Sequence, residues 1–160
     1  MRWLWIDKFT QFTPGTSATA VKNVTMAEEH LHDLYPDFPI VPHSLIIEGM
    51  AQTAGILVGH AGGFAQKVIL AKIGRATFRR LVRPGDTLEF SARMEQFSEQ
   101  GAAISGTVTC AGELVAQIEL MFSHIDQNMA GLEFPSHNFV FTEQFTSLLA
   151  PCLRQSSISL

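Results

Sequence analysis

The chain has 160 residues, of which 46% are hydrophobic and 16% charged, and its formal net charge is −4 at pH 7. This length fits one domain with a single core, and the negative charge argues against general nucleic-acid binding. The charged share is below the roughly 25% of an average domain, which predicts that part of the surface is an oligomer interface. Cys110 and Cys152 form no disulfide pattern and are expected to be free thiols of a cytoplasmic protein.

The first third of the chain predicts two strands and a rigid approach to a helix. Residues 3–12 and 18–24 have strand-like composition, with a turn at Pro14 and Gly15 between them. Residues 28–33 are polar and predict either a single helical turn or a loop. Three prolines, at positions 36, 39 and 42, then predict a stiff extended segment.

The strongest predicted helix runs from Ser44 to about Val58. Ser44 suits the N-cap or first turn, and the glycines at 59, 62 and 63 mark the exit. Apolar residues surround this helix almost completely, which is typical of a buried helix that other elements enclose. The stretch from 44 to 61 also contains Glu48, Gln52 and His60, so we do not interpret it as a membrane span.

Strand patterns dominate the remainder, at residues 67–73, 76–82, 87–97, 102–110 and 114–125, with turns at 84–86, 100–101 and 111–113. A buried helix followed by antiparallel strands predicts an α+β fold in which a curved sheet wraps the helix. We therefore expect a domain over residues 1–125 and a C-terminal extension over 126–160. Phe134, Phe139 and Phe141 predict that the extension packs on the core, and residues 142–149 predict a helix capped by Thr142 and ended by Pro151.

Glu48 is the best candidate for chemistry, because a carboxylate in an apolar helix is costly unless it is exposed, paired or used. Helical spacing places Ser44, Glu48 and Gln52 near one face, so Gln52 is expected to hydrogen-bond Glu48 and hold its orientation. Backbone amides near His43 and Ser44, just after Pro42, are candidate oxyanion donors. A partly exposed structural carboxylate is the alternative interpretation.

Residues 34–52 resemble the motif His-Phe-Pro-Gly-x-Pro-x-Met-Pro-Gly-x-Leu-x-x-Glu-Ala-Met-Ala-Gln of the 3-hydroxyacyl-acyl-carrier-protein dehydratases. The matching positions are Pro36, Pro39, Pro42, Leu45, Glu48, Met50, Ala51 and Gln52. A second block, residues 71–86, resembles the strand and Pro-Gly-Asp turn of that family, and the resemblance extends over approximately residues 5–125. It implies a hotdog fold, a homodimer or a trimer of dimers with sites shared between chains, and a substrate carried on phosphopantetheine with no other cofactor.

The same alignment departs from the motif at two important places, since the catalytic His of the family falls on Leu34 and its second Gly on His43. The resemblance implies that Glu48 is the acid that helps the 3-hydroxyl group leave as water, while the base must come from another residue. If residues 32–34 are extended, His32 points to the same side as Leu34 but lies about 6–7 Å along the chain. His43 is the second candidate, because the positive end of a helix dipole favours a neutral imidazole.

Basic residues concentrate between positions 67 and 83, which hold six of the eleven. Arg75, Arg79, Arg80 and Arg83 predict either solvated strand edges or a docking patch for an acidic carrier protein and its phosphate. No metal-binding spacing and no glycine-rich nucleotide loop is present in the sequence.

Three functions remain open from the sequence. The first is a 3-hydroxyacyl-thioester dehydratase that acts on acyl-carrier protein or coenzyme A thioesters. The second is a hotdog acyl thioesterase that uses Glu48 without a loop His. The third is a catalytically impaired partner that binds acyl-carrier protein.

Overall fold

The structure is a computed structural model that describes residues 3–125, 135, 138 and 140–156. Its strands are β1 (Lys8–Thr13), β2 (Ser17–Asn23), β3 (Val68–Phe78), β4 (Thr87–Phe97), β5 (Gly101–Cys110) and β6 (Glu113–His124). Its helices are α1 (Glu29–Asp33), α2 (His43–Ala61), α4 (Glu143–Ser147) and α5 (Ala150–Ser156). Within the described residues, no helix has the length and hydropathy needed to cross a membrane.

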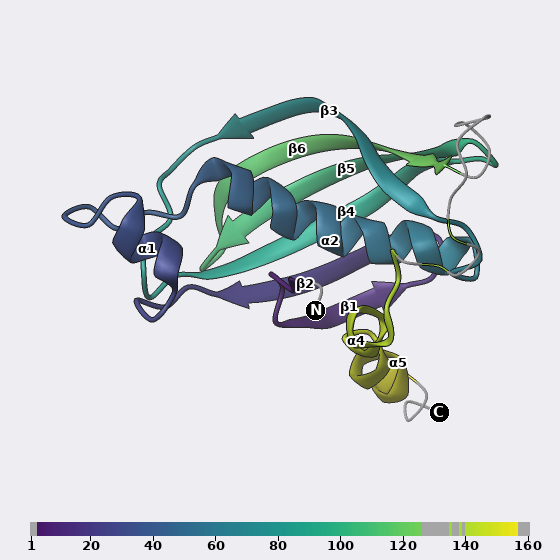
Figure 1. Cartoon of the computed structure of the whole chain (residues 1–160), viewed down its shortest axis with the longest axis horizontal. Coiled ribbons are helices and arrows are strands. Elements are labelled where there is room, and N and C mark those ends of the chain that lie inside the picture. The colour runs from purple at the N-terminus through teal and green to yellow at the C-terminus, as the bar shows by residue number, and fades with distance from the viewer. Residues whose placement is uncertain (1–2, 126–134, 136–137, 139, 157–160) are drawn as a thin grey trace.

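One curved antiparallel sheet wraps the long helix α2 (Figure 1). The strand order is β1-β2-β4-β5-β6-β3, so β1 and β3 are the two edges. Alternation along β5 buries every second residue against the core, as expected for a sheet that covers a helix on one face only. The predicted α+β fold, with a curved sheet around one central helix, is confirmed.

The helix lies close to the sheet because small residues stand at the contact. An ideal Cβ on Gly49 of α2 would lie only 2.4 Å from Cζ of the fully buried Phe90 of β4, so a side chain there would collide with the ring. On the sheet side, Gly106 of β5 leaves the same kind of room for Met50. These close approaches hold α2 in a fixed rotation, which decides which of its side chains point away from the sheet.

Several predicted boundaries are wrong for identifiable reasons. The helix runs over His43–Ala61 instead of 44–58, with Pro42 as its N-cap residue, and Ser44 lies in the first turn, which is one of its two predicted positions. The predicted strands 67–73 and 76–82 are one strand, β3, because two irregularities in its register with β6 absorb the break around Gly74. The first strand starts only at Lys8, because the preceding segment around Trp5 binds α2 instead.

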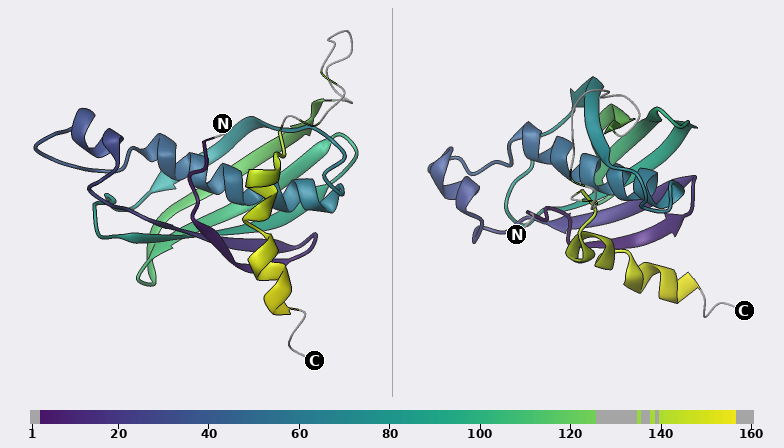
Figure 2. Two further views of the ribbon diagram at one scale, coloured as in Figure 1. Left: turned by 60° about the horizontal axis from the view of Figure 1, so that its bottom comes forward. Right: turned by 45° about the vertical axis from the view of Figure 1, so that its right-hand side comes forward.

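The C-terminal segment, by which we mean described residues 138 and 140–156, packs on the helix and on β1 (Figure 2). The predicted single helix is two short helices, α4 and α5. Pro151 lies in the first turn of α5, where its missing N–H costs nothing, and it therefore begins a helix instead of ending one. Phe141 is buried, whereas the predicted packing of Phe134 and Phe139 lies outside the described residues.

Both cysteines are buried, and neither forms a disulfide, which agrees with the sequence-based prediction.

Candidate active site

Glu48 is held by a hydrogen-bonded connection to the start of the chain. Gln52 donates from Nε2 to Glu48 Oε1 at 2.8 Å, which confirms the predicted pair. The other amide atom, Gln52 Oε1, accepts from the backbone N–H of Trp5 at 2.8 Å, and Nε2 also donates to the carbonyl of Trp3 at 3.1 Å. The segment before β1 therefore fixes Gln52, and Gln52 fixes one carboxylate oxygen of Glu48.

Glu48 lines a cavity of about 250 Å³ between α2, the start of β3 and the C-terminal segment. Glu48 and Gln52 supply the ionisable and amide groups, and the other lining residues are small or apolar. These are Ala51, Gly55, Val68, Ile69, Leu70, Phe122, Val140, Phe141 and Phe145. A single carboxylate at the edge of an apolar cavity can donate or accept a proton at one place on a bound apolar molecule.

The proposed bases lie elsewhere in the chain. His43 is the first residue of α2, is exposed and stacks on Phe78 with ring centroids 3.8 Å apart. His32 is exposed on α1, and its ring contacts the carbonyl of Met26. Residues 32–34 are not extended as assumed, because α1 runs to Asp33 and Leu34 has αR dihedral angles at its C-cap. Neither histidine lines the Glu48 cavity of its own chain.

His30 is a residue that the sequence analysis did not assign to the site. Its ring packs edge-on against Trp5 at 5.3 Å between centroids, and its buried Nε2 has no hydrogen-bond partner among the described residues. Burial lowers the pKa of His30, Glu28 opposes this shift and Lys22 adds to it. Burial thus favours the neutral imidazole of His30, which packs against Trp5 of the segment that binds Gln52. The sequence held no signal for this, because it depends on the contact with Trp5.

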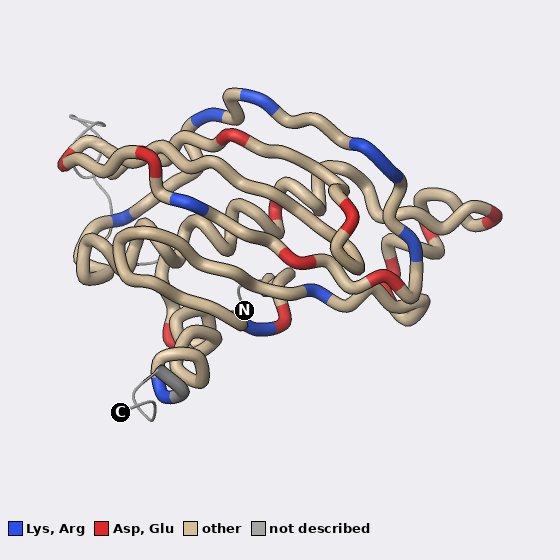
Figure 3. Tube along the Cα trace, turned by 180° about the vertical axis from the view of Figure 1, so that it is seen from behind, with Lys and Arg blue, Asp and Glu red and all other residues tan. Residues whose placement is uncertain are grey.

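The basic residues predicted to form a docking patch lie along β3 and the segment after it (Figure 3). Arg80 pairs through both terminal nitrogens with Asp86 at 3.2 Å, and Arg75 lies 3.8 Å from Glu119. The hydrogen bonds that Arg80 donates to Asp86 raise the pKa of Arg80. Arg83 lies over the ring of Phe38 at 4.6 Å. Within the described part of the chain, Arg79 and Arg83 form no ion pair, so their charges are available to a partner.

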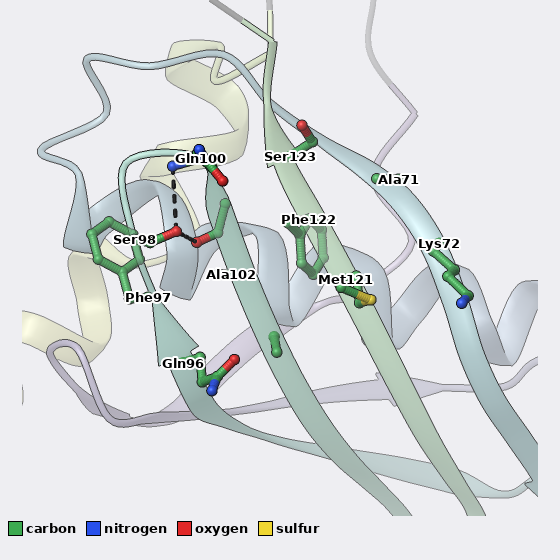
Figure 4. Close-up of a pocket in the computed structure, with 12 residues that line it drawn as sticks. Ala71, Lys72, Gln96, Phe97, Ser98, Gln100, Ala102, Met121, Phe122 and Ser123 are labelled. Atoms are coloured by element: carbon green, nitrogen blue, oxygen red, sulfur yellow. Dashed lines mark hydrogen bonds between the residues drawn. The ribbon is translucent and has the colours of Figure 1, made fainter. Parts of the chain in front are cut away.

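A larger pocket of about 750 Å³ lies at the ends of β4, β5 and β6 (Figure 4). Ser98 closes its loop by donating to the carbonyl of Gly101 and accepting from the backbone N–H of Gln100. Lys72 is the one ionisable residue in its lining. Since its lining contains no carboxyl group of the kind that Glu48 supplies, this pocket is a weaker candidate for catalysis than the Glu48 cavity.

No group of three or more His, Cys, Asp or Glu residues is placed to hold a metal ion in the portion of the chain that the structure describes.

Comparison with known proteins gives a consistent result. Residues 1–119 match the FabA-like domain family. The 3-hydroxyacyl-[acyl-carrier-protein] dehydratase FabZ of Rickettsia rickettsii is 38% identical over 116 residues, which cover 71% of this chain and 80% of that protein. The FabZ dehydratase of Roseobacter denitrificans is 38% identical over 121 residues, covering 72% of this chain and 80% of that protein.

Solved structures show the same hotdog fold. The dehydratase heterocomplex ApeI:P from Xenorhabdus doucetiae has a TM-score of 0.62 at 15% identity, covering 79% of this chain and 90% of that chain. The E. coli PaaI protein from the phenylacetic acid degradation operon has a TM-score of 0.60 at 15% identity, covering 75% of this chain and 79% of that chain. At such identities the likeness concerns the fold alone.

Proposed function

The chain belongs to the FabA-like family, and from this premise we propose that it is a 3-hydroxyacyl-thioester dehydratase of fatty-acid or related acyl-chain biosynthesis. The reaction removes the proton from C2 of the acyl chain and the hydroxyl group from C3, and the products are a 2-enoyl thioester and water. The acyl chain arrives on the phosphopantetheine of an acyl-carrier protein or of coenzyme A, and the reaction needs no further cofactor. Two buried cysteines that form no disulfide support a reducing cytoplasmic location.

One observation carries the proposal, namely that Gln52 fixes the Glu48 carboxyl group at the edge of an apolar cavity. A general acid must be held within hydrogen-bond reach of the group that it protonates. As the general acid, Glu48 gives a proton to the 3-hydroxyl group, which leaves as water, while a base takes the proton from C2. The apolar lining excludes water from the rest of the acyl chain.

We assign the base to a second copy of the chain. Both His32 and His43 are exposed near the start of α2, and neither reaches the cavity of its own chain. The edge strand β3 also exposes the apolar side chains of Leu70 and Ile73, which is costly for an isolated monomer. A homodimer that joins the β3 edges covers these side chains and brings a histidine of one copy towards Glu48 of the other.

Mixing two inactive variants tests the shared site. Glu48→Gln removes the acid and leaves the shape, and His32→Ala or His43→Ala removes the base, with an expected loss of roughly 10²-fold or more. After denaturation and joint refolding, half of the dimers are hybrids with one intact site, so about a quarter of the parental turnover returns. A parental rate for both histidine variants contradicts their assignment. No recovery on mixing contradicts a site shared between chains.

The same assay separates the other functions. The pure protein is incubated with a 3-hydroxyacyl thioester and, separately, with a saturated acyl thioester. Enoyl product supports the dehydratase, and free thiol from the saturated substrate identifies a thioesterase that uses Glu48 alone. Neither product identifies a binding partner that does not catalyse the reaction.

We also propose that Arg79 and Arg83, which lack acidic partners in the described chain, form the docking contacts for an acidic carrier protein. Arg75 and Arg80 are already paired and contribute less. Charge reversal of Arg79 and Arg83 to Glu should raise KM for a carrier-protein substrate by at least tenfold at low salt. The KM for the same acyl group on a short uncharged thiol should not change, and an equal rise for both substrates contradicts docking.

A further inference from the structure

The far wall of the Glu48 cavity comes from a part of the chain beyond the family match, which ends at residue 119. Val140, Phe141 and Phe145 line the cavity together with residues of α2, β3 and β6. Phe141 and Phe145 are buried, and their rings are near parallel at 6.3 Å between centroids. The C-terminal segment therefore completes a cavity that the rest of the domain leaves open.

The floor of the cavity is one face of α2, along which the side chains become smaller towards the C-terminal end of the helix. Glu48, Ala51 and Gly55 follow one another at helical spacing, and all three line the cavity. An ideal Cβ on Gly55 would have Phe122 Cε1 as its nearest neighbour at 3.8 Å, which is ordinary van der Waals contact, so there is room for a methyl group above this glycine. One turn later the space ends, because an ideal Cβ on Gly59 would lie 2.3 Å from Phe141 Cζ. Phe141 thus sits directly on the helix backbone at Gly59.

The wall is firmly anchored. The side chain of Asn138 donates to the carbonyl groups of Phe64 and Gln66 at 2.9 and 3.1 Å, and its Oδ1 accepts from the backbone N–H groups of Val140 and Phe141. The ring of Phe64 contacts that of Phe141 at 5.1 Å between centroids. One amide side chain therefore ties the C-terminal segment to the turn between α2 and β3.

We propose that the C-terminal segment is the end wall of an acyl-binding channel and restricts the protein to short acyl chains. In a bound substrate the reacting carbons lie beside Glu48 and the methyl end lies against Phe141 and Phe145, which rests on the proposed function. Gly55 follows Glu48 by seven residues, which corresponds to about 10 Å along the helix. An extended hydrocarbon advances about 1.25 Å per carbon, because bonds of about 1.5 Å meet at tetrahedral angles, so roughly eight carbons fit before the wall.

Two opposite variants test the wall. Phe145→Ala shortens a side chain of the wall and should admit longer chains, with kcat/KM rising about fourfold for each extra methylene that becomes buried. Gly55→Leu fills the space above the helix and should lower kcat/KM for chains near the limit at least tenfold while sparing the shortest substrate. Leu149→Ala is the matched control, because Leu149 is buried in the same segment but does not line the cavity.

Binding without turnover separates this inference from the proposed function. Saturated acyl-pantetheine compounds of increasing length are titrated by calorimetry against the parent, Phe145→Ala, Gly55→Leu and Leu149→Ala. The expected result is a parental affinity that stops rising near eight carbons, a limit that moves up in Phe145→Ala, down in Gly55→Leu and not at all in Leu149→Ala. This pattern supports the wall even if no dehydration is seen. A limit that is the same in all four proteins, or that moves equally in Leu149→Ala, overturns it.

Discussion

Replacing Gln52 with Met tests whether the start of the chain and Glu48 are connected through one side chain. Methionine keeps the length and most of the volume of Gln52 but has no amide group to donate or accept. The variant removes the bonds from Gln52 Nε2 to Glu48 and to the Trp3 carbonyl, and it removes the acceptor of the Trp5 N–H. Because Trp5 is buried, this N–H cannot bind water instead.

The expected loss follows from these contacts. A buried donor without an acceptor costs about 1–3 kcal/mol, and each of the two lost donor contacts adds about 0.5–1.5 kcal/mol. The free energy of unfolding should therefore fall by about 3 kcal/mol. At about 2–4 °C for each kcal/mol in a chain of this size, the midpoint of thermal unfolding should drop by roughly 6–12 °C.

Thermal unfolding followed by circular dichroism measures this change at a fixed protein concentration, since the midpoint of an oligomer depends on concentration. Thr53→Val is the control, because Thr53 is equally buried but donates only to the carbonyl of Gly49 in its own helix. That carbonyl stays within the helix when the hydroxyl group is removed, so the free energy of unfolding of the control should fall by less than about 1 kcal/mol. If Gln52→Met is no less stable than Thr53→Val, the proposed connection between Trp5 and Glu48 is wrong.

Three further predictions concern other parts of the fold. Burial raises the pKa of Asp86, but bonds from its partners outweigh this and hold the pKa below the ordinary 3.8, so its stabilisation is present above that pH and is lost as the pH falls through the lowered pKa. Asp86→Asn should lower the free energy of unfolding by about 1–3 kcal/mol at neutral pH and should weaken the decrease of this free energy at acid pH. Urea unfolding at a series of pH values measures both, and an unchanged pH dependence contradicts the prediction. Gly55→Ala should stabilise α2 by about 0.5–1 kcal/mol, whereas Gly49→Ala should destabilise it by about 1–3 kcal/mol through collision with Phe90, and equal midpoints would refute the packing argument. Leu34→His restores the histidine of the family motif at an exposed position and should raise dehydratase turnover, and an unchanged rate in a folded variant shows that the base lies elsewhere.

The predicted site was partly recoverable from the sequence, because some of it is local. Glu48 and Gln52 are four residues apart on one helix, so helical geometry alone predicts their hydrogen bond, and the structure confirms it. The assumption that residues 32–34 are extended, which placed His32 on the same side as Leu34, is wrong because the local sequence is uninformative there. It required an extended backbone in a polar segment that has too little pattern to distinguish a short helix from a loop.

The ends of the strands also depend partly on local sequence and partly on pairing with other strands. Strand β4 runs over residues 87–97 as predicted, because alternating hydrophobicity and the preceding Pro-Gly-Asp turn are both local features of the sequence. Gly85 in this turn has φ +94°, a conformation that glycine adopts at little cost. Sequence patterns predict two strands, 67–73 and 76–82, where the structure has the single strand β3, because only pairing with β6 makes this strand continuous.

Periodicity, turn residues and a motif are all properties of short stretches, so they were enough to predict most of the strands, the buried helix, the family and the importance of Glu48. What surrounds the Glu48 carboxylate depends on contacts between distant parts of the chain. Trp5 binds Gln52 across 47 residues, and Asn138 binds Phe64 across 74. Such contacts depend on how the helix is rotated in the sheet and where the chain returns, and no local pattern encodes either. The wall that closes the cavity is therefore visible only once the chain is folded.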